Sequence, residues 1–310
     1  TTLARLGAAG VPVVCYNFMP VVDWTRTALR YPTRNGGLAL RFDMAAFAAY
    51  DVHVLRRAGA DADYADDILV AAEGHYSSMD EAAIDELERT IIAGLPGGED
   101  SYTRETIRAR IAEFRDIGAE DLRATLTEFI EEIAPVAEEA GVRLGIHPDD
   151  PPFSLFGLPR VVSTPNDLSA VLAASDAPAN GLTLCSGSLG ARADNDVVAI
   201  AQAFAERVNF AHLRNVSVDP DGSFMEDEHL DGSTDMVRLC AVLIAEERRR
   251  ESKGLDAPIP MRPDHGHLLF DDKDRRTNPG YSCLGRMKGL AELRGVMQAL
   301  ESGVTLAQPA

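Results

Sequence analysis

The sequence predicts a parallel α/β fold, and two observations lead to that prediction. Five short runs of β-branched or apolar residues each end abruptly in polar, Gly or Pro residues: 11–18, 142–146, 181–184, 207–211 and 257–261. Stretches whose apolar residues recur at helical spacing, such as 165–175 and 194–208, separate the later runs. The repeated order of strand, polar loop and amphipathic helix is typical of parallel sheets that helices cover on both faces.

The first two runs are separated by a long polar segment, from about 38 to about 140, whose apolar residues also recur at helical spacing. We expect this segment to be a helical insertion within a single domain that spans 1–310. With five strands evident, the sheet is either an open doubly wound sheet or part of an eight-stranded barrel. Residues 1–10 are predicted to be the end of a helix, so we expect further βα units before the first residue of the sequence.

Composition and charge exclude several classes of protein. Hydrophobic residues make up 45% of the chain and charged residues 25%, as in globular proteins. The sequence contains no apolar run long enough to span a membrane and begins with no signal-peptide pattern, so we predict a cytoplasmic protein without a membrane partner. The net charge of −19 repels nucleic acid, which we also exclude as a partner. An anionic substrate would need a local cation or an arginine cluster in its site.

The second to fifth runs are each followed by a side chain of a type that binds metals. In chain order these residues are His147, Cys185, His212 and Asp264. Because the carboxyl ends of parallel strands meet at one rim, we expect the four side chains to lie close together. Two imidazoles, a thiolate and a carboxylate are suitable ligands for one divalent transition metal. His265 and His267 are alternatives to Asp264 on the same loop.

Each of these residues, taken alone, also has a structural interpretation. A histidine beside a strand is often a hydrogen-bonded structural residue, and a lone cysteine is often a small buried hydrophobic residue. An aspartate after a strand commonly caps the turn that follows it. The four cysteines are scattered without a CxxC pair, which excludes a zinc ribbon or a disulfide scaffold. The occurrence of four ligand-type residues at equivalent strand ends therefore favours a metal site.

Six segments, in this order, resemble the mannonate dehydratase family of xylose-isomerase-like barrels: 15–27, 146–152, 185–196, 212–216, 262–267 and 278–296. The resemblance covers nearly the whole sequence and implies an α/β fold, a (β/α)8 TIM barrel of the xylose-isomerase-like type with a helical insertion. Five of its eight strands are evident here. The family chain carries roughly eighty further residues at its N-terminus, on the order of three βα units.

The resemblance implies a lyase that dehydrates D-mannonate to 2-keto-3-deoxy-D-gluconate with one Mn²⁺ or Fe²⁺ ion. By position, the four strand-end residues match the family's metal ligands, while His265 and Tyr281 match its proposed acid–base pair. Such a reaction removes the proton beside the carboxylate and protonates the departing hydroxyl, with the metal as a Lewis acid. The sequence does not assign which residue is the base. The resemblance also implies a homo-oligomer, expected to be a dimer.

Further residues are candidates for contacts with the sugar acid: Arg192, Arg214, Arg262, Asn17, Trp24 and Asp149. The arginines lie in predicted rim loops, where a guanidinium binds a carboxylate well, although a solvated loop arginine is an equal alternative. The loop 222–232 carries Met225 where the family pattern has a polar residue. If the side chain at position 225 reaches the substrate, we expect the substrate specificity of this chain to differ from that of the family.

Two other functions stay open at this point. A xylose-isomerase-like isomerase or epimerase would bind its metals through carboxylates and histidines, so Cys185 counts against it. A catalytically silent protein that binds a metal or a sugar acid is the alternative of another class. Such a protein has no need of an acid–base pair, so His265 and Tyr281 count against it.

Overall fold

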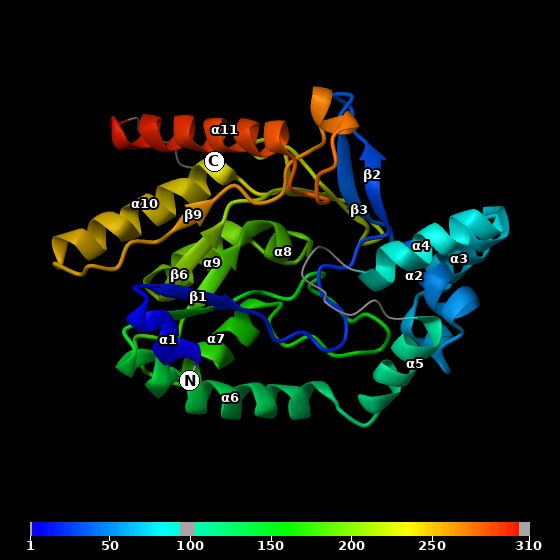
Figure 1. Cartoon of the computed structure of the whole chain (residues 1–310), viewed down its shortest axis with the longest axis horizontal. Coiled ribbons are helices and arrows are strands. Elements are labelled where there is room, and N and C mark those ends of the chain that lie inside the picture. The colour runs from blue at the N-terminus through cyan, green and yellow to red at the C-terminus, as the bar shows by residue number, and fades with distance from the viewer. Residues whose placement is uncertain (1, 94–102, 304–310) are drawn as a thin grey trace.

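The computed structural model describes residues 2–93 and 103–303 (Figure 1). Its central sheet has five parallel strands in the order β1-β4-β5-β6-β9 and curls as half of a barrel. The strands are β1 (Val13–Tyr16), β4 (Arg143–Ile146), β5 (Leu182–Cys185), β6 (Val208–His212) and β9 (Met261–Arg262). Each coincides with a predicted apolar run. The spatial order follows the chain order without reversal, which excludes a doubly wound sheet and confirms the predicted barrel.

Helices connect the strands of this sheet and cover its outer side (Figure 1). They are α1 (Thr2–Ala8), α6 (Ala119–Glu139), α7 (Pro165–Ala173), α9 (Val197–Phe204), α10 (Met236–Ser252) and α11 (Cys283–Glu301). In α6, Leu122, Leu126 and Ile130 recur every fourth residue and are all buried in the main core. This spacing aligns one apolar face of the helix with the sheet, as the sequence pattern predicts.

A second sheet, antiparallel and ordered β2-β3-β8-β7, lies beside the barrel. Its strands are β2 (Ala28–Pro32), β3 (Leu38–Phe42), β7 (Val216–Val218) and β8 (Phe224–Glu226). No sequence pattern predicts these strands, and β3 lies in the segment expected to be helical. Each strand has five residues or fewer, and β3 pairs with β8 from a distant part of the chain. Long-range pairing therefore outweighs the local helical spacing at this point.

Helices follow β3 as expected and form the right-hand part of Figure 1. They are α2 (Met44–Ala49), η1 (Tyr50–Leu55), η2 (Ala60–Asp63), α3 (Asp66–Ser78), α4 (Glu81–Ala93) and α5 (Arg104–Glu113). Three short helices lie elsewhere in the chain: α8 (Ser186–Gly190), η3 (Ala205–Arg207) and η4 (Phe270–Asp274). A second hydrophobic cluster includes Phe47, Ile91 and Ile107 of these helices together with Phe42 and Phe224 of the second sheet. None of the helices within the described ranges has the length and apolar composition needed to cross a membrane.

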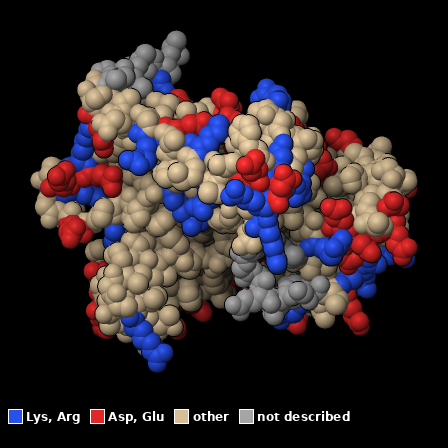
Figure 2. Space-filling model, turned by 45° about the horizontal axis from the view of Figure 1, so that its top comes forward, with Lys and Arg blue, Asp and Glu red and all other residues tan. Residues whose placement is uncertain are grey.

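Charge is distributed over the surface with an excess of acidic groups. Figure 2 shows many Asp and Glu side chains over the right-hand end, where α3, α4 and α5 lie, and scattered basic side chains near the middle. The excess agrees with the net charge of −19. An anionic ligand would therefore be attracted by local groups in its site rather than by the overall field.

Candidate metal centre and active site

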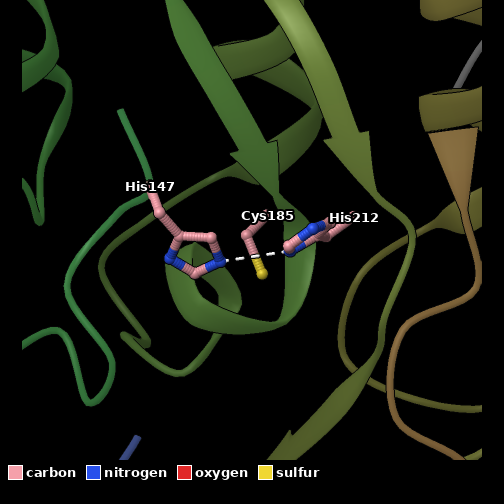
Figure 3. Close-up of side chains that lie close together, drawn as sticks. All are labelled: His147, Cys185 and His212. Atoms are coloured by element: carbon pink, nitrogen blue, oxygen red, sulfur yellow. Dashed lines mark hydrogen bonds between the residues drawn. The ribbon is translucent and has the colours of Figure 1, made fainter. Parts of the chain in front are cut away.

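Three of the four predicted metal ligands meet at the carboxyl ends of β4, β5 and β6. The ligand atoms of His147, Cys185 and His212 lie within 4.8 Å of one another, and all three residues are buried. Figure 3 shows the three side chains pointing toward a common centre. Cys185 and His212 are the last residues of β5 and β6 and lie opposite each other in the parallel ladder. The pairing of the strands therefore sets the spacing of the ligands.

Hydrogen bonds and nearby charges determine which atoms of these side chains carry protons. His147 Nδ1 lies 2.6 Å from the Pro148 carbonyl oxygen, to which it donates, so the lone pair of His147 is on Nε2. That Nε2 lies 3.1 Å from His212 Nδ1. Burial alone would raise the pKa of Cys185, but the Arg214 guanidinium and His147 hold it well below its ordinary value. A thiolate beside two ring nitrogens fits a divalent transition metal.

Asp264 lies at the edge of this cluster. Its Oδ2 is 3.7 Å from His212 Nδ1, and its Oδ1 accepts a hydrogen bond of 2.8 Å from Arg262 Nη2. Burial would raise the pKa of Asp264, but His265 and His212 hold it below its ordinary value, so the carboxylate is charged. His267, the alternative on this loop, directs its Nε2 to the main-chain oxygen of Glu226 at 2.9 Å. His267 Nε2 is therefore hydrogen-bonded outside the candidate metal cluster.

The predicted acid–base pair lies next to Asp264. The rings of His265 and Tyr281 meet edge to face with centroids 5.5 Å apart. Gly280, at φ +77°, brings the chain so close that a Cβ there would lie 2.9 Å from a ring carbon of His265. Only glycine fits this approach without strain. Burial, then the charge of Asp264, raises the pKa of Tyr281, so its phenol keeps its proton.

A buried network of charges that the sequence does not predict lies against these residues. Arg26 donates to Asp150 at 2.7 Å and to Glu226 at 2.8 Å, and Arg214 Nη2 donates to Asp150 at 2.6 Å. All four side chains are at most 4% exposed. A Cβ on Gly187 would lie 2.1 Å from Arg214 Nε, so glycine at this position leaves room for the guanidinium. Arg26 and Asp150 belong to segments that resemble the family, but sequence alone does not show that they pair across 124 positions.

Three of the six predicted substrate contacts lie beside the cluster. The Trp24 ring meets the edge of the His147 ring with centroids 5.3 Å apart. Arg262 bonds Asp264, and its side chain is 40% exposed. Arg214 is buried among the charges described above, with its guanidinium held by Asp150. Of these three side chains, Trp24 and Arg262 are partly exposed, whereas Arg214 is buried.

The other three predicted substrate contacts form hydrogen bonds outside the candidate metal cluster. Arg192 pairs with Asp194, and Asn17 donates to Asp23 at 2.9 Å. Asp149, although it follows His147 by two residues, accepts hydrogen bonds from the loop before α7. None of these contacts involves a predicted metal ligand.

Met225 lies between two buried residues of β8, Phe224 and Glu226. Successive side chains of a strand point to opposite faces, so Met225 points away from the face that carries Glu226. Glu226 contacts His265, with its Oε1 3.0 Å from His265 Nδ1. The residue of this strand that reaches the site is therefore Glu226.

The half-barrel and the buried His–Cys–His cluster at its carboxyl rim define an α/β-barrel enzyme with a candidate metal centre. The chain belongs to the D-mannonate dehydratase (UxuA) family, whose profile matches residues 1–306. This membership confirms the predicted family and the predicted enzyme class, a hydro-lyase.

Individual relatives agree with that assignment. Mannonate dehydratase 2 of Agrobacterium fabrum is 61% identical over 300 residues, which are 97% of this chain and 76% of that protein. The mannonate dehydratase of Saccharophagus degradans is 59% identical over 302 residues, with the same two shares. The crystal structure of mannonate dehydratase from Streptococcus suis serotype 2 superposes with a TM-score of 0.72 at 31% identity, covering 99% of this chain and 72% of that one.

Proposed function

We propose that this chain dehydrates D-mannonate to 2-keto-3-deoxy-D-gluconate with one divalent ion, Mn²⁺ or Fe²⁺, held by His147, Cys185, His212 and Asp264. The observation that carries the proposal is the buried cluster of three ligand side chains, inside a chain that belongs to the D-mannonate dehydratase family. This membership also favours dehydration over the isomerase and the silent binding protein.

The donor set fits such an ion. Cys185 is held as a thiolate, His147 presents the lone pair of Nε2, and Asp264 is ionised beside them. When bound, the ion would supply Lewis-acid chemistry toward the substrate carboxylate and the adjacent hydroxyl, and would offset the repulsion by the acidic surface. Thiolate favours Fe²⁺, whereas carboxylate and substrate oxygens favour Mn²⁺, so both ions stay in the proposal.

His265 and Tyr281 carry the proton transfers in this proposal. Removal of water from the sugar acid needs a base at the carbon beside the carboxylate and an acid at the departing hydroxyl. Tyr281 keeps its proton because burial and Asp264 raise its pKa, which suits a donor to the hydroxyl. Trp24 and Arg262 would contact the sugar acid next to His265 and Tyr281.

An assay of turnover tests the proposal. The protein is incubated with D-mannonate and either Mn²⁺ or Fe²⁺, with and without a chelator, and the 2-keto-3-deoxy acid is measured. We expect product with at least one of the two ions and none after chelation. An absence of product with every divalent ion tried would overturn the proposal.

Two variants separate metal binding from proton transfer. Cys185→Ser is expected to lose bound metal, whereas His265→Asn is expected to keep the metal and to lose activity by a factor of about 10² to 10⁴. Metal content is measured by elemental analysis of the dialysed proteins. If both variants kept full metal and full activity, the site would lie elsewhere.

The single-domain organisation over 1–310, the homodimer and the cytoplasmic location stay predictions from sequence and resemblance. A sugar acid is the small-molecule partner that family membership implies.

A further inference from the structure

We propose that Glu226 is a positioning residue for His265: its carboxylate accepts the Nδ1–H of the ring and so leaves the Nε2 lone pair free to take a proton. This inference rests on the proposed function, in which His265 moves a proton. It concerns a residue of the second, antiparallel sheet, which reaches into the site from outside the barrel strands.

The geometry places the two ends of the His265 ring in different surroundings. Nδ1 lies 3.0 Å from Glu226 Oε1, in the buried network. Nε2 lies on the side of the candidate metal ligands, 3.9 Å from Asp264 Oδ2. A substrate held at the metal centre would therefore meet Nε2, and the proton on the ring must be at Nδ1 if His265 is to act as a base.

Arg214 competes with Glu226 for the same ring nitrogen. Arg214 Nη1 also lies 3.0 Å from His265 Nδ1, and a guanidinium can only donate. If Arg214 donated to Nδ1, the proton of the neutral ring would be on Nε2, where it would block proton abstraction. Glu226 and Arg214 therefore specify opposite tautomers of His265.

Two arginines hold the Glu226 carboxylate where it can accept the Nδ1–H of His265. Glu226 is 3% exposed, Arg26 Nη2 donates to its Oε1 at 2.8 Å, and Arg214 Nε lies 3.3 Å from its Oε2. These two guanidinium groups keep the carboxylate charged. A charged acceptor binds the ring N–H more strongly than a neutral one does.

Nitrogen NMR of the histidine rings tests the inference directly, since the ¹⁵N shifts of a neutral ring distinguish its two tautomers. The protein is labelled with [¹⁵N]histidine and loaded with diamagnetic Zn²⁺, and the His265 signal is identified by its loss in His265→Asn. With seven histidines in the chain, the spectrum is tractable. We expect Nδ1–H in the unchanged protein and Nε2–H in Glu226→Leu.

This readout does not depend on turnover, so failure of the dehydratase assay and failure of the positioning role are distinguishable. If Glu226→Leu does not fold, Glu226→Gln replaces it. The amide oxygen of Gln still accepts from Nδ1, so we expect this variant to keep the Nδ1–H tautomer. Nε2–H in the unchanged protein, or Nδ1–H retained in Glu226→Leu, would overturn the inference.

Kinetics supply a second test. Glu226→Leu is expected to lower kcat by about 100-fold or more while KM and bound metal stay within about threefold, because the His265 ring would carry its proton on Nε2 while the proposed metal ligands are unchanged. Glu226→Gln is expected to recover part of kcat. Glu228→Gln is the matched control: Glu228 lies two residues away, bonds Lys288 rather than His265, and should keep the original kcat. A loss of metal or a KM increase as large as the fall in kcat would show a merely structural role and overturn the inference.

Discussion

At the scale of single residues, His147 is constrained on three sides. The Pro148 carbonyl fixes its tautomer, His212 Nδ1 lies 3.1 Å from its Nε2, and the Trp24 ring meets its edge. Such constraints reduce the rotamer freedom that a flexible ligand would lose on binding a metal. Trp24 itself has φ +46°, an uncommon conformation for a bulky residue.

Trp24 should report metal binding, because it is the single tryptophan of the chain and its ring centroid lies 5.3 Å from that of His147. We expect Mn²⁺, a paramagnetic ion, to quench tryptophan emission in a saturable titration. In Cys185→Ser the titration should shift to higher metal concentration. Unchanged emission in a sample that equilibrium dialysis shows to be loaded would contradict the predicted position of the ion.

At the scale of elements, the barrel strands and the second sheet differ in how far the sequence predicts them. Strands β4, β5 and β6 are buried on both faces and are therefore continuous apolar runs, so their ends, and with them His147, Cys185 and His212, are predictable. The strands of the second sheet are short, and β3 finds its partner β8 almost two hundred positions along the chain. No local pattern specifies such a pairing.

Local sequence does not predict the positions of the buried charged residues of the site either. Glu226 follows an apolar residue in a polar loop sequence, and its chemical type alone indicates a solvated side chain. Its burial follows from the position of β8 and from Arg26, which lies 200 positions away. The cluster of His147, Cys185 and His212 could thus be predicted from the strands that carry it, whereas the network around His265 could not.

Phe224 anchors the strand that carries Glu226. It is fully buried, stacks on Phe42 with centroids 5.6 Å apart and lies under the Arg26 guanidinium at 4.8 Å. We expect Phe224→Ala to lower the free energy of unfolding by about 3–5 kcal/mol, measured by urea denaturation. The matched control is Met225→Ala, a half-buried neighbour on the other face of β8, for which about 1 kcal/mol is expected. Equal losses would show that the two faces of β8 are not distinct.

At the scale of the whole molecule, the buried charges join segments that are far apart in sequence. Arg26, Asp150, Arg214 and Glu226 come from the loop after β1, the loop after β4, the loop after β6 and the second sheet. Two arginines face two carboxylates, so the network is balanced in charge. Protonation of either acid would leave buried guanidinium groups uncompensated, which is costly in a low-dielectric interior. The network therefore links the stability of the whole chain to pH.

The pKa of Glu226 determines how the stability of the fold changes with pH. Burial alone would raise its pKa, but Arg214, His265 and Arg26 lower it from 4.5 to about 2 in the folded chain. A group whose folded pKa is depressed stabilises the fold above its unfolded pKa, and this contribution is lost as pH falls from 4.5 toward 2. We expect Glu226→Gln to be less stable than the unchanged protein at pH 7, with a shallower loss of stability below about pH 4.5.

The measurement is the free energy of unfolding in urea at a series of pH values from about 7 down to about 3. Surface carboxylates titrate in both proteins, so the difference between the two curves isolates the contribution of Glu226. The curves should converge as the pH falls, because protonation removes the charge that the variant already lacks. Curves that stay parallel over this range would show that Glu226 is not held ionised by its arginines, and that the network does not couple the fold to pH.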